Sequence, residues 1–174
     1  MADIVDRQTR SRMMGSIRHK DTVPERRLRS LLFAQGLRFR LHRRDLPGSP
    51  DLVFPRHRAV IFVHGCFWHR HPGCRFATTP ATNQGFWAAK FAANVQRDRY
   101  TIDALREMGW RIGVVWECQL RGEHAADTAT KVGVWLRSLT PRLPELPPAV
   151  QKGVPAPPRR VGGRGRAAQR SRPA

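Results

Sequence analysis

The sequence predicts a small α/β domain in which a mixed sheet is flanked by helices. Two observations carry this prediction. Segments with helical spacing of apolar residues alternate with short strand-like segments, in the order helix, three strands, helix, strand, helix. The chain also has 174 residues, of which 40% are hydrophobic, and this is enough to bury one core.

A basic segment precedes the first expected helix. Residues 1–21 show no sustained apolar periodicity, and they carry Arg7, Arg10, Arg12, Arg18 and Lys20. We expect them to form a basic arm. The next segment, DTVPERRLRSLLFAQG at 21–36, predicts a helix, because a capping Asp or Thr and a proline stand at its start and a glycine at its end.

Three short strands are expected next. Residues 37–42, LRFRLH, alternate in the manner of a strand, and a Pro/Gly turn leads into a short strand at 51–54. The third strand lies within HRAVIFVHG, residues 57–65. Its side chains alternate between two faces, with Val60, Phe62 and His64 on one and Ile61 and Val63 on the other.

A longer helix is predicted over residues 84–108. Its apolar stripe comprises Phe91, Val95, Ile102 and Leu105. Asp98 occupies the position that this stripe leaves open. A carboxylate on an inward face is costly unless it is paired or hydrogen-bonded. The alternative is an aspartate at the helix edge that faces solvent.

The last elements are a strand and a helix. WRIGVVWEC, residues 110–118, predicts a strand with Ile112, Val114, Trp116 and Cys118 on one face. A helix follows over residues 124–139. The Pro/Gly/Arg-rich residues 141–174 are expected to be a disordered basic tail, so that the folded domain comprises residues 22–140.

The formal net charge of +19 is the strongest bulk property of the chain. A folded domain with so much positive charge usually binds a polyanion, and nucleic acid is the first candidate. A membrane surface is less favoured, because neither an apolar run of transmembrane length nor a lipidation motif is present. The first residues, MADIVDRQTR, lack the apolar core of a signal peptide, so we expect a cytosolic protein.

Three cysteines and a nearby histidine suggest a metal site. An odd number of cysteines argues against a disulfide framework. Cys66, His71, Cys74 and Cys118 make a Cys3His set, which is a common shell for structural zinc. The spacing of the first three allows a short loop to wrap a tetrahedral ion. The alternative is three buried thiols and a surface histidine.

A second group of residues suits phosphodiester hydrolysis, which needs a carboxylate to hold a divalent cation and a base to accept a proton from water. Asp51, at the start of a strand, can hold Mg2+, which prefers oxygen ligands. His64 and His69 remain after zinc has taken its ligands, and either can transfer protons near neutral pH. Asp98 can orient one of the two imidazoles.

Two adjacent aromatic residues, Phe67 and Trp68, stand in the same loop as the zinc ligands. Apolar side chains inserted between base steps kink and unstack duplex DNA. Trp87, near the start of the long helix, can join them. The alternative for all three is ordinary core packing.

These residues carry a resemblance to a known family. The segments SPDLVFPRHRAVIFVHGCFWHRHPGC, NVQRDR and WRIGVVWEC closely resemble the very short patch repair (Vsr) endonucleases, and the likeness runs from the arm, TRSRMMGSIRHKDTVPE, to about residue 138. The family comprises bacterial enzymes of the restriction-endonuclease-like PD-(D/E)xK fold that nick DNA beside a T:G mismatch. The resemblance therefore implies this fold.

The resemblance also implies roles for individual residues. Asp51 resembles the Mg2+-binding aspartate, assisted by the main-chain carbonyl of Val63. His69 resembles the proton-transfer histidine, paired with Asp98, and His64 its companion near the scissile phosphate. Glu25 is similar to another acidic residue of the family's site. The zinc ligands match those of the family. The residues that match its intercalating side chains are Phe67, Trp68, Trp87 and, on the arm, Met14.

The function implied is Mg2+-dependent nicking 5′ of the T in a T:G mismatch left by deamination of 5-methylcytosine. A polymerase and a ligase then complete the repair. The implied partner is double-stranded DNA bound by a monomer, with mismatch-repair proteins as further partners, in the bacterial cytoplasm at the nucleoid. The arm is then a DNA-binding arm.

One departure from the general nuclease motif is visible. The E/D-x-K half is absent, since FVH stands on the strand where it is expected, and the lysine that usually assists the water is missing. Two other functions fit parts of the pattern. One is a zinc-stabilised DNA-binding protein without catalysis, which leaves Asp51 and Asp98 without a role. The other is a restriction-type nuclease of the same fold that makes double-strand breaks.

Overall fold

The computed structural model describes residues 20–145. Its regular elements follow the predicted order: α2 (Val23–Ala34), β1 (Arg40–Leu41), β2 (Leu52–Phe54), β3 (Ala59–His64), α3 (Gln84–Glu107), β4 (Arg111–Trp116) and α4 (His124–Arg137). Short 3-10 turns follow β2 and β4, at Pro55–His57 and Glu117–Leu120. The basic arm at 1–19 and the tail beyond residue 145, both predicted above, lie outside the described residues.

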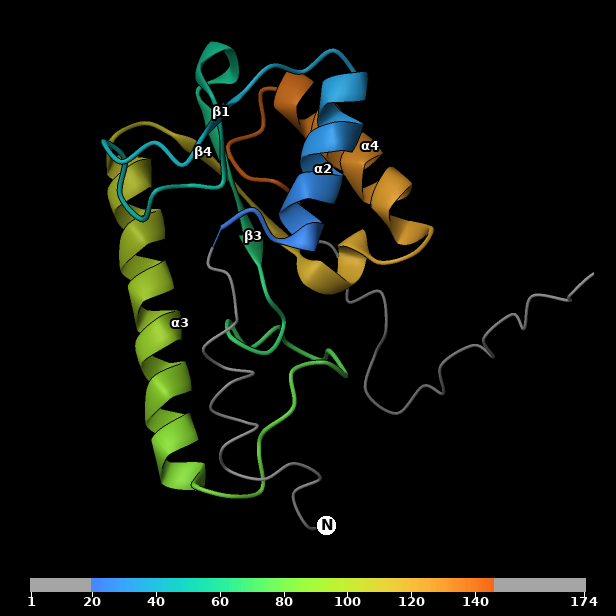
Figure 1. The fold of residues 1–174 in the computed structure, drawn as a ribbon. Helices are drawn as coiled ribbons and strands as arrows, with labels where there is room; N and C mark the ends of the chain where they lie inside the picture. The colour runs from blue at the N-terminus through green and yellow to red at the C-terminus, as the bar shows by residue number, and fades with distance from the viewer. Residues whose placement is uncertain (1–19, 146–174) are drawn as a thin grey trace, which may run out of the picture.

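The four strands form one mixed sheet in the order β1-β2-β3-β4. The pairs β1–β2 and β2–β3 are antiparallel, whereas β3 and β4 are parallel. The connection between the two parallel strands carries α3 across one face of the sheet, and α2 and α4 cover the other face (Figure 1). This arrangement confirms the predicted small mixed sheet flanked by helices.

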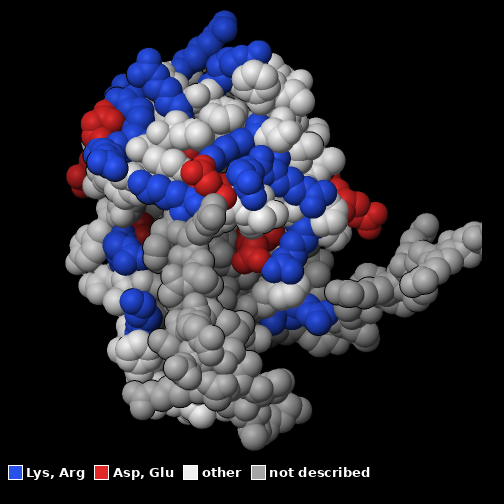
Figure 2. Space-filling model, in the orientation of Figure 1, with Lys and Arg blue, Asp and Glu red and all other residues white. Residues whose placement is uncertain are grey.

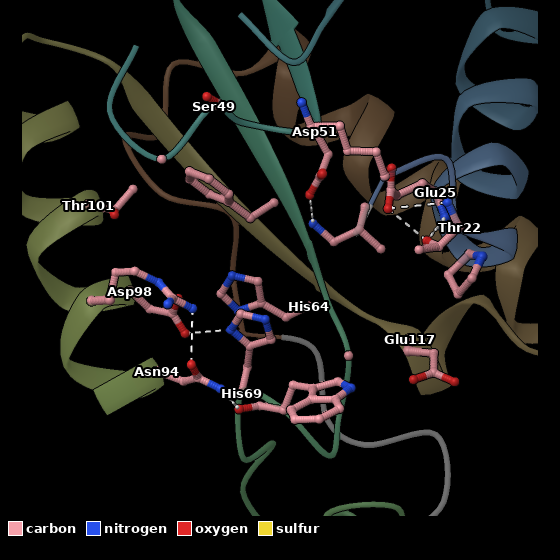
Figure 3. Close-up of a pocket in the computed structure, with 18 of the residues that line it drawn as sticks. Thr22, Glu25, Ser49, Asp51, His64, His69, Asn94, Asp98, Thr101 and Glu117 are labelled. Carbon is pink, nitrogen blue, oxygen red and sulfur yellow. Dashed lines mark hydrogen bonds and ion pairs between the residues drawn. The ribbon is translucent and has the colours of Figure 1, made fainter. Parts of the chain in front are cut away.

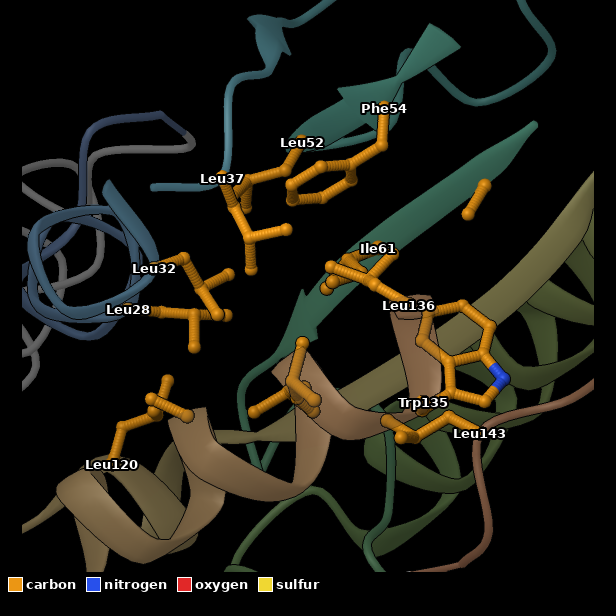
Figure 4. Close-up of a cluster of buried hydrophobic side chains, with 14 of the residues drawn as sticks. Leu28, Leu32, Leu37, Leu52, Phe54, Ile61, Leu120, Trp135, Leu136 and Leu143 are labelled. Atoms are coloured by element: carbon orange, nitrogen blue, oxygen red, sulfur yellow. The ribbon is translucent and has the colours of Figure 1, made fainter. Parts of the chain in front are cut away.

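Two hydrophobic cores lie on the two faces of the sheet. The larger one joins α2 and α4 to the sheet (Figure 4), and its members include Leu28, Leu32, Phe54, Ile61, Val132 and Trp135. The smaller one lies under α3 and includes Val60, Phe62, Leu105 and Ile112. The side chains of β3 therefore alternate between the two cores, as its sequence predicts.

The first predicted strand is much shorter than expected. Of residues 37–42, only Arg40 and Leu41 pair with β2. Leu37 is buried in the larger core, and His42 has a φ of 45°, in the left-handed region, which turns the chain out of the sheet. The alternation of apolar and polar residues over 37–42 predicts neither the burial of Leu37 nor the turn at His42.

The folded domain also continues beyond the predicted boundary at residue 140. Arg142 forms a bridge with Ile112, and Leu143 is buried in the larger core. The guanidinium of Arg111 donates to the carbonyl of Thr140. A buried side chain, a backbone bridge and a side-chain hydrogen bond thus fix the first residues of a segment with tail-like composition. In the described part of the chain, no helix is both long enough and apolar enough to cross a membrane.

Candidate active site and metal centre

A cleft of about 880 Å3 lies at the end of β3, between the start of α2 and the middle of α3. Its wall contains all five residues that were predicted to be catalytic: Glu25, Asp51, His64, His69 and Asp98. Asp98 lies on one side of β3, Asp51 and Glu25 lie on the other, and the two histidines stand between them (Figure 3). Residues far apart in the sequence are thus brought to one cavity.

Asp51 stands immediately before β2, next to the last residues of β3. Because β2 begins at Leu52, the backbone N–H of Val63 finds no strand partner there and donates instead to Asp51 Oδ2, at 2.7 Å. Burial raises the pKa of Asp51 from 3.8 to about 6, and this hydrogen bond opposes the rise. The carboxylate is therefore costly to ionise in the absence of a cation.

His69 and Asp98 form a close pair across the cleft. His69 Nδ1 lies 2.5 Å from Asp98 Oδ2, and the two side chains are 22% and 18% exposed. Burial raises the pKa of Asp98, but the hydrogen bond to His69 and the nearby His64 outweigh it, so that the net direction is downward. An ionised Asp98 accepts a hydrogen bond from Nδ1–H and leaves Nε2 of a neutral His69 as a proton acceptor.

His64 is the buried companion of His69. The two imidazole rings stack with centroids 4.0 Å apart. Burial lowers the pKa of His64 to about 3, and the neighbouring His69 adds to this effect. His64 is therefore neutral near pH 7, and within residues 20–145 it is His69, of the two rings, that is hydrogen-bonded to a carboxylate.

Glu25 accepts hydrogen bonds from residues at the start of α2 and from Arg29, one turn further along the helix. It is buried, and it forms a capping box with Thr22, the residue at the N-cap of α2. One oxygen accepts from the Thr22 hydroxyl at 2.7 Å. The other accepts from the backbone of Asp21 at 3.0 Å and from Arg29 at 2.7 Å. Its carboxylate thus holds the start of α2 and the guanidinium of Arg29.

The predicted zinc ligands converge beside the cleft. Cys66, His71, Cys74 and Cys118 are all buried, and their ligand atoms lie within 4.8 Å of one another. Nδ1 of His71 is 3.6 Å from the sulfur of Cys66 and 3.4 Å from that of Cys118. These distances match the edge of a tetrahedron around zinc, about 3.5 Å for usual Zn–S and Zn–N bonds.

The thiols of this cluster are not stable as thiolates without an ion. The hydrogen bond to Cys118 and burial raise the pKa of Cys66, and burial raises the pKa of Cys74. A bound cation removes this cost, because thiolates are the form that ligates metals. The donor set and its geometry therefore fit a structural zinc ion.

The predicted aromatic residues form one cluster at the start of α3. The ring of Phe67 lies edge-on to those of Trp68, Trp87 and Phe91, at centroid distances of 5.0, 5.5 and 5.1 Å. Trp87 is buried, whereas Phe67 and Trp68 are half-buried. Trp68 and Trp87 line the cleft, and Phe67 packs behind them. Met14 lies outside the described residues.

Comparison with known proteins identifies the group to which this chain is related. The family model described as DNA mismatch endonuclease Vsr matches residues 2–75. Over 124 residues, the chain is 52% identical to the DNA mismatch endonuclease Vsr of Escherichia coli, covering 71% of this chain and 79% of that protein. The chain belongs to the Vsr family.

Other relatives carry names of the same kind. The type II nicking enzyme V.XorIIP of Xanthomonas oryzae is 50% identical over 69% of this chain and 88% of its own length. The type II nicking enzyme V.NmeAIP of Neisseria meningitidis is 38% identical over 71% of this chain and 87% of its own length. Both the mismatch endonucleases and the nicking enzymes thus share most of this domain.

The structure of this Vsr-family chain adds cleft residues that the sequence did not single out. Asn94 is buried on α3 and donates to the backbone carbonyl of Trp68 at 3.1 Å. It stands four residues before Asp98, so helical spacing from that aspartate can find it. His42 and Phe86 also line the cleft. Phe86 is 63% exposed and adjoins Trp87, and its place beside that residue in the sequence is a usable signal.

Proposed function

We propose that this protein is a Mg2+-dependent endonuclease that nicks double-stranded DNA 5′ of the T in a T:G mismatch. Such mismatches arise when 5-methylcytosine deaminates, and the nick initiates very short patch repair. One observation carries the proposal. A carboxylate suited to a cation, Asp51, and a carboxylate–histidine pair, Asp98–His69, line the same cleft in a chain with a net charge of +19.

In this proposal, Asp51 and the main-chain carbonyl of Val63 hold Mg2+. Within a strand, the N–H and C=O of one residue point to the same side, and the Val63 N–H faces Asp51. The raised pKa of Asp51 supports this role, because a bound cation stabilises the ionised form of a buried carboxylate. Mg2+ supplies Lewis-acid stabilisation of the charge that develops on the phosphate.

His69 acts as the general base in the proposed reaction. Asp98 fixes the Nδ1–H tautomer of its ring, so that Nε2 accepts the proton of the attacking water. His64 keeps the ring of His69 in place by stacking and contributes neutral imidazole contacts near the scissile phosphate. Glu25 acts as a support for the site through Arg29 and the start of α2.

Structural Zn2+ at the Cys3His cluster stiffens the loop between Cys66 and Cys74, which carries His69 and the aromatic residues. Phe67, Trp68 and Trp87 then enter the base stack beside the mismatch, and Met14 enters from the arm. Unstacking costs least where base pairing is already poor, so such insertion favours a mismatched substrate.

We also propose the PD-(D/E)xK nuclease fold for the domain predicted at 22–140, which packing extends to Leu143, with Phe62, Val63 and His64 at the place of the usual E/D-x-K pattern. Residues 1–21 are proposed as a DNA-binding arm. The tail was predicted at 141–174, and because Leu143 belongs to the core, the part beyond Leu143 is proposed to add nonspecific DNA affinity. The protein acts as a monomer on DNA in the bacterial cytoplasm at the nucleoid, with mismatch-repair proteins as further partners. The Lys and Arg side chains over β1 and α2 (Figure 2) agree with a polyanionic partner.

The decisive experiment compares a labelled duplex that contains one T:G mismatch in a cytosine-methylase-type site with its fully paired twin. Each duplex is incubated with protein and Mg2+, in parallel with Asp51→Ala and with the control Asp103→Ala, an exposed aspartate on α3. We expect a single nick 5′ of the mismatched T, absent from the twin and from Asp51→Ala. Tight binding without cleavage supports a zinc-stabilised binding protein instead, and double-strand breaks in paired DNA support a restriction-type nuclease.

A further inference from the structure

His42 lies directly behind the proposed cation ligand Asp51. It follows β1, in the left-handed backbone conformation noted above, and its side chain is 14% exposed. Its ring is placed between two charged groups. Nε2 lies 3.0 Å from Nη2 of Arg29, and Nδ1 lies 3.8 Å from Oδ1 of Asp51.

The contact with Arg29 determines the tautomer of His42. A guanidinium has only donors, so the ring nitrogen at 3.0 Å must accept, and the proton of a neutral imidazole must then reside on Nδ1. Arg29 itself is held in place, because it also donates to Glu25 at 2.7 Å and pairs with Asp21. The Nδ1–H form of His42 is therefore imposed from α2.

This tautomer directs a donor towards Asp51. The two carboxylate oxygens of Asp51 have different neighbours: Oδ2 accepts from the backbone of Val63, and Oδ1 faces Nδ1–H of His42. The separation of 3.8 Å is longer than a hydrogen bond, so that a hydrogen bond requires the two groups to approach by several tenths of an ångström. One donor thus bonds to the carboxylate, and a second donor, from a separate element, faces its other oxygen.

His42 itself does not qualify as a metal ligand here. Its Nε2 lies within 4.8 Å of carboxylate oxygens of Asp21 and Glu25, the spacing of a cation site. However, the guanidinium of Arg29 contacts all three side chains and takes the place of a cation. With one nitrogen bonded to Arg29 and the other protonated, the ring has no free lone pair to offer.

We propose that His42 is a positioning residue for Asp51, held in its Nδ1–H tautomer by Arg29. The tautomer stands on the contacts of the ring alone, whereas the effect on catalysis rests on the proposed function. A carboxylate that is restrained on both oxygens binds a cation with less loss of rotational freedom, and partners of this kind orient metal-binding groups. The chain of contacts from Glu25 through Arg29 and His42 then gives α2 a part in cation binding.

The first test is structural. Long-range 1H–15N NMR of the full-length zinc-loaded protein at pH 7.5, without Mg2+ or DNA, reports which nitrogen of each histidine carries the proton. The His42 signals are assigned by their loss in His42→Gln. We expect protonated Nδ1 and unprotonated Nε2. A ring protonated on Nε2, alone or together with Nδ1, overturns the proposal.

The second test uses the Mg2+ dependence of nicking on the T:G duplex. We expect His42→Ala to raise the Mg2+ concentration for half-maximal rate by about tenfold, as loss of such supporting partners does. We expect His42→Gln to bring the Mg2+ concentration for half-maximal rate back close to that of the parent, because an amide can accept from Arg29 and donate to Asp51. Both variants face the same positive φ, so their comparison removes the backbone effect, and melting temperatures verify folding.

His124→Gln, an exposed histidine at the start of α4 and outside the cleft, is the matched control and is expected to change nothing. Equal Mg2+ dependence of His42→Ala and the parent overturns the positioning role. Absence of nicking by the parent itself refutes the proposed function instead, and the tautomer measurement is independent of that outcome.

Discussion

Asp51 and Asp98 are two carboxylates of one cleft whose environments shift their pKa values in opposite directions. Burial raises the pKa of Asp51 to about 6. For Asp98, burial acts in the same direction, but the imidazole of His69 at 2.5 Å outweighs it. Such divergence separates the roles of two like groups. Asp98 is ionised and hydrogen-bonded to His69. The ionised form of Asp51 is costly in free energy, and a bound cation would stabilise it.

Replacing Asp51 with Asn is expected to stabilise the protein when Mg2+ is absent. The folded pKa of about 6 exceeds the ordinary value of 3.8, so the folded state binds more protons between these two pH values. The stabilisation that this raised pKa gives to the folded state is complete below about pH 4 and is lost as the pH rises through about 6. At pH 8, Asp51→Asn should therefore raise the free energy of unfolding by about 2–3 kcal/mol.

Urea unfolding at pH 8 and pH 5, in Mg2+-free buffer that leaves bound zinc in place, measures this effect. The gain should shrink at pH 5, where much of Asp51 is already protonated. The control is Asp103→Asn, which removes an exposed carboxylate whose ion pair is with Arg106 on the same helix. A destabilising Asp51→Asn at pH 8 contradicts the raised pKa.

Replacing Asp98 with Asn should affect the chemical step and leave cation binding unchanged. The amide can turn its NH2 group towards His69 and thereby move the ring proton to Nε2, which removes the proton acceptor. We expect the single-turnover nicking rate at saturating Mg2+ to fall by about 10²–10⁴-fold. The Mg2+ concentration for half-maximal rate and the DNA affinity should match those of the parent. A rate that stays within about threefold of the parent excludes His69–Asp98 as the catalytic pair.

At the scale of elements, α2 links fold stability to the cleft. Its first turn is closed by the reciprocal hydrogen bonds of Thr22 and Glu25, and Glu25 in turn holds Arg29. The residues that cap this helix therefore also build one wall of the site. A helix end with this double role should be sensitive to small changes.

We expect Thr22→Ala to lower the free energy of unfolding by about 1 kcal/mol, since it removes an N-cap side chain. The matched control is Ser30→Ala, an exposed position within the same helix, where alanine is the better helix former and the change should be slightly stabilising. Urea denaturation monitored by circular dichroism compares the two. Equal effects of the two substitutions mean that the capping box contributes nothing.

Elements with a consistent pattern were predictable from the sequence, and those that depend on distant packing were not. Helix α3 ends within one residue of its predicted bounds, because its buried residues, Trp87, Phe91, Asn94 and Leu105, recur at helical spacing. The strand predicted over 37–42 keeps only Arg40 and Leu41, because the positive φ of His42 and the burial of Leu37 decide its length. Neither is encoded in the local alternation of apolar and polar residues.

The same distinction holds for the site. Asp98 was found because a carboxylate interrupts an apolar stripe, and the zinc ligands because their residue types and spacing are rare. The contact between Arg29 and His42 was not found, since it joins two elements whose approach no periodicity reports. The packing of Leu143 was missed for a related reason, because its Pro-rich context masks a single apolar residue.

At the scale of the whole molecule, the parallel pair β3–β4 explains why the cleft and the metal cluster adjoin. Parallel neighbours end at the same edge of the sheet, so the loop after β3 and the turn after β4 meet there. Cys66 and Cys74 come from that loop and Cys118 from that turn. The proposed zinc ion, bound by all of them, would tie together two chain segments that the two large hydrophobic cores do not join, since the cysteines form a separate buried cluster.

Replacing Cys118 with Ser should therefore release the loop and leave the rest of the fold intact. We expect bound zinc to fall from about one ion per chain to none, because the shell loses a ligand from its only distant segment. Nicking should fall at least about tenfold, since His69 and Trp68 lie on the released loop. The two large cores contain no cysteine, so the helix content at 25 °C should change little.

Elemental analysis, far-ultraviolet circular dichroism and nicking of the T:G duplex are measured on the same preparations. Arg75→Gln, an exposed position next to Cys74, serves as the control and should retain zinc. If Cys118→Ser keeps both its zinc and its nicking rate, the cluster is not the support of the catalytic loop. If it unfolds entirely, the metal belongs to the global stability of the domain, and the division into two cores and a separately tied loop is wrong.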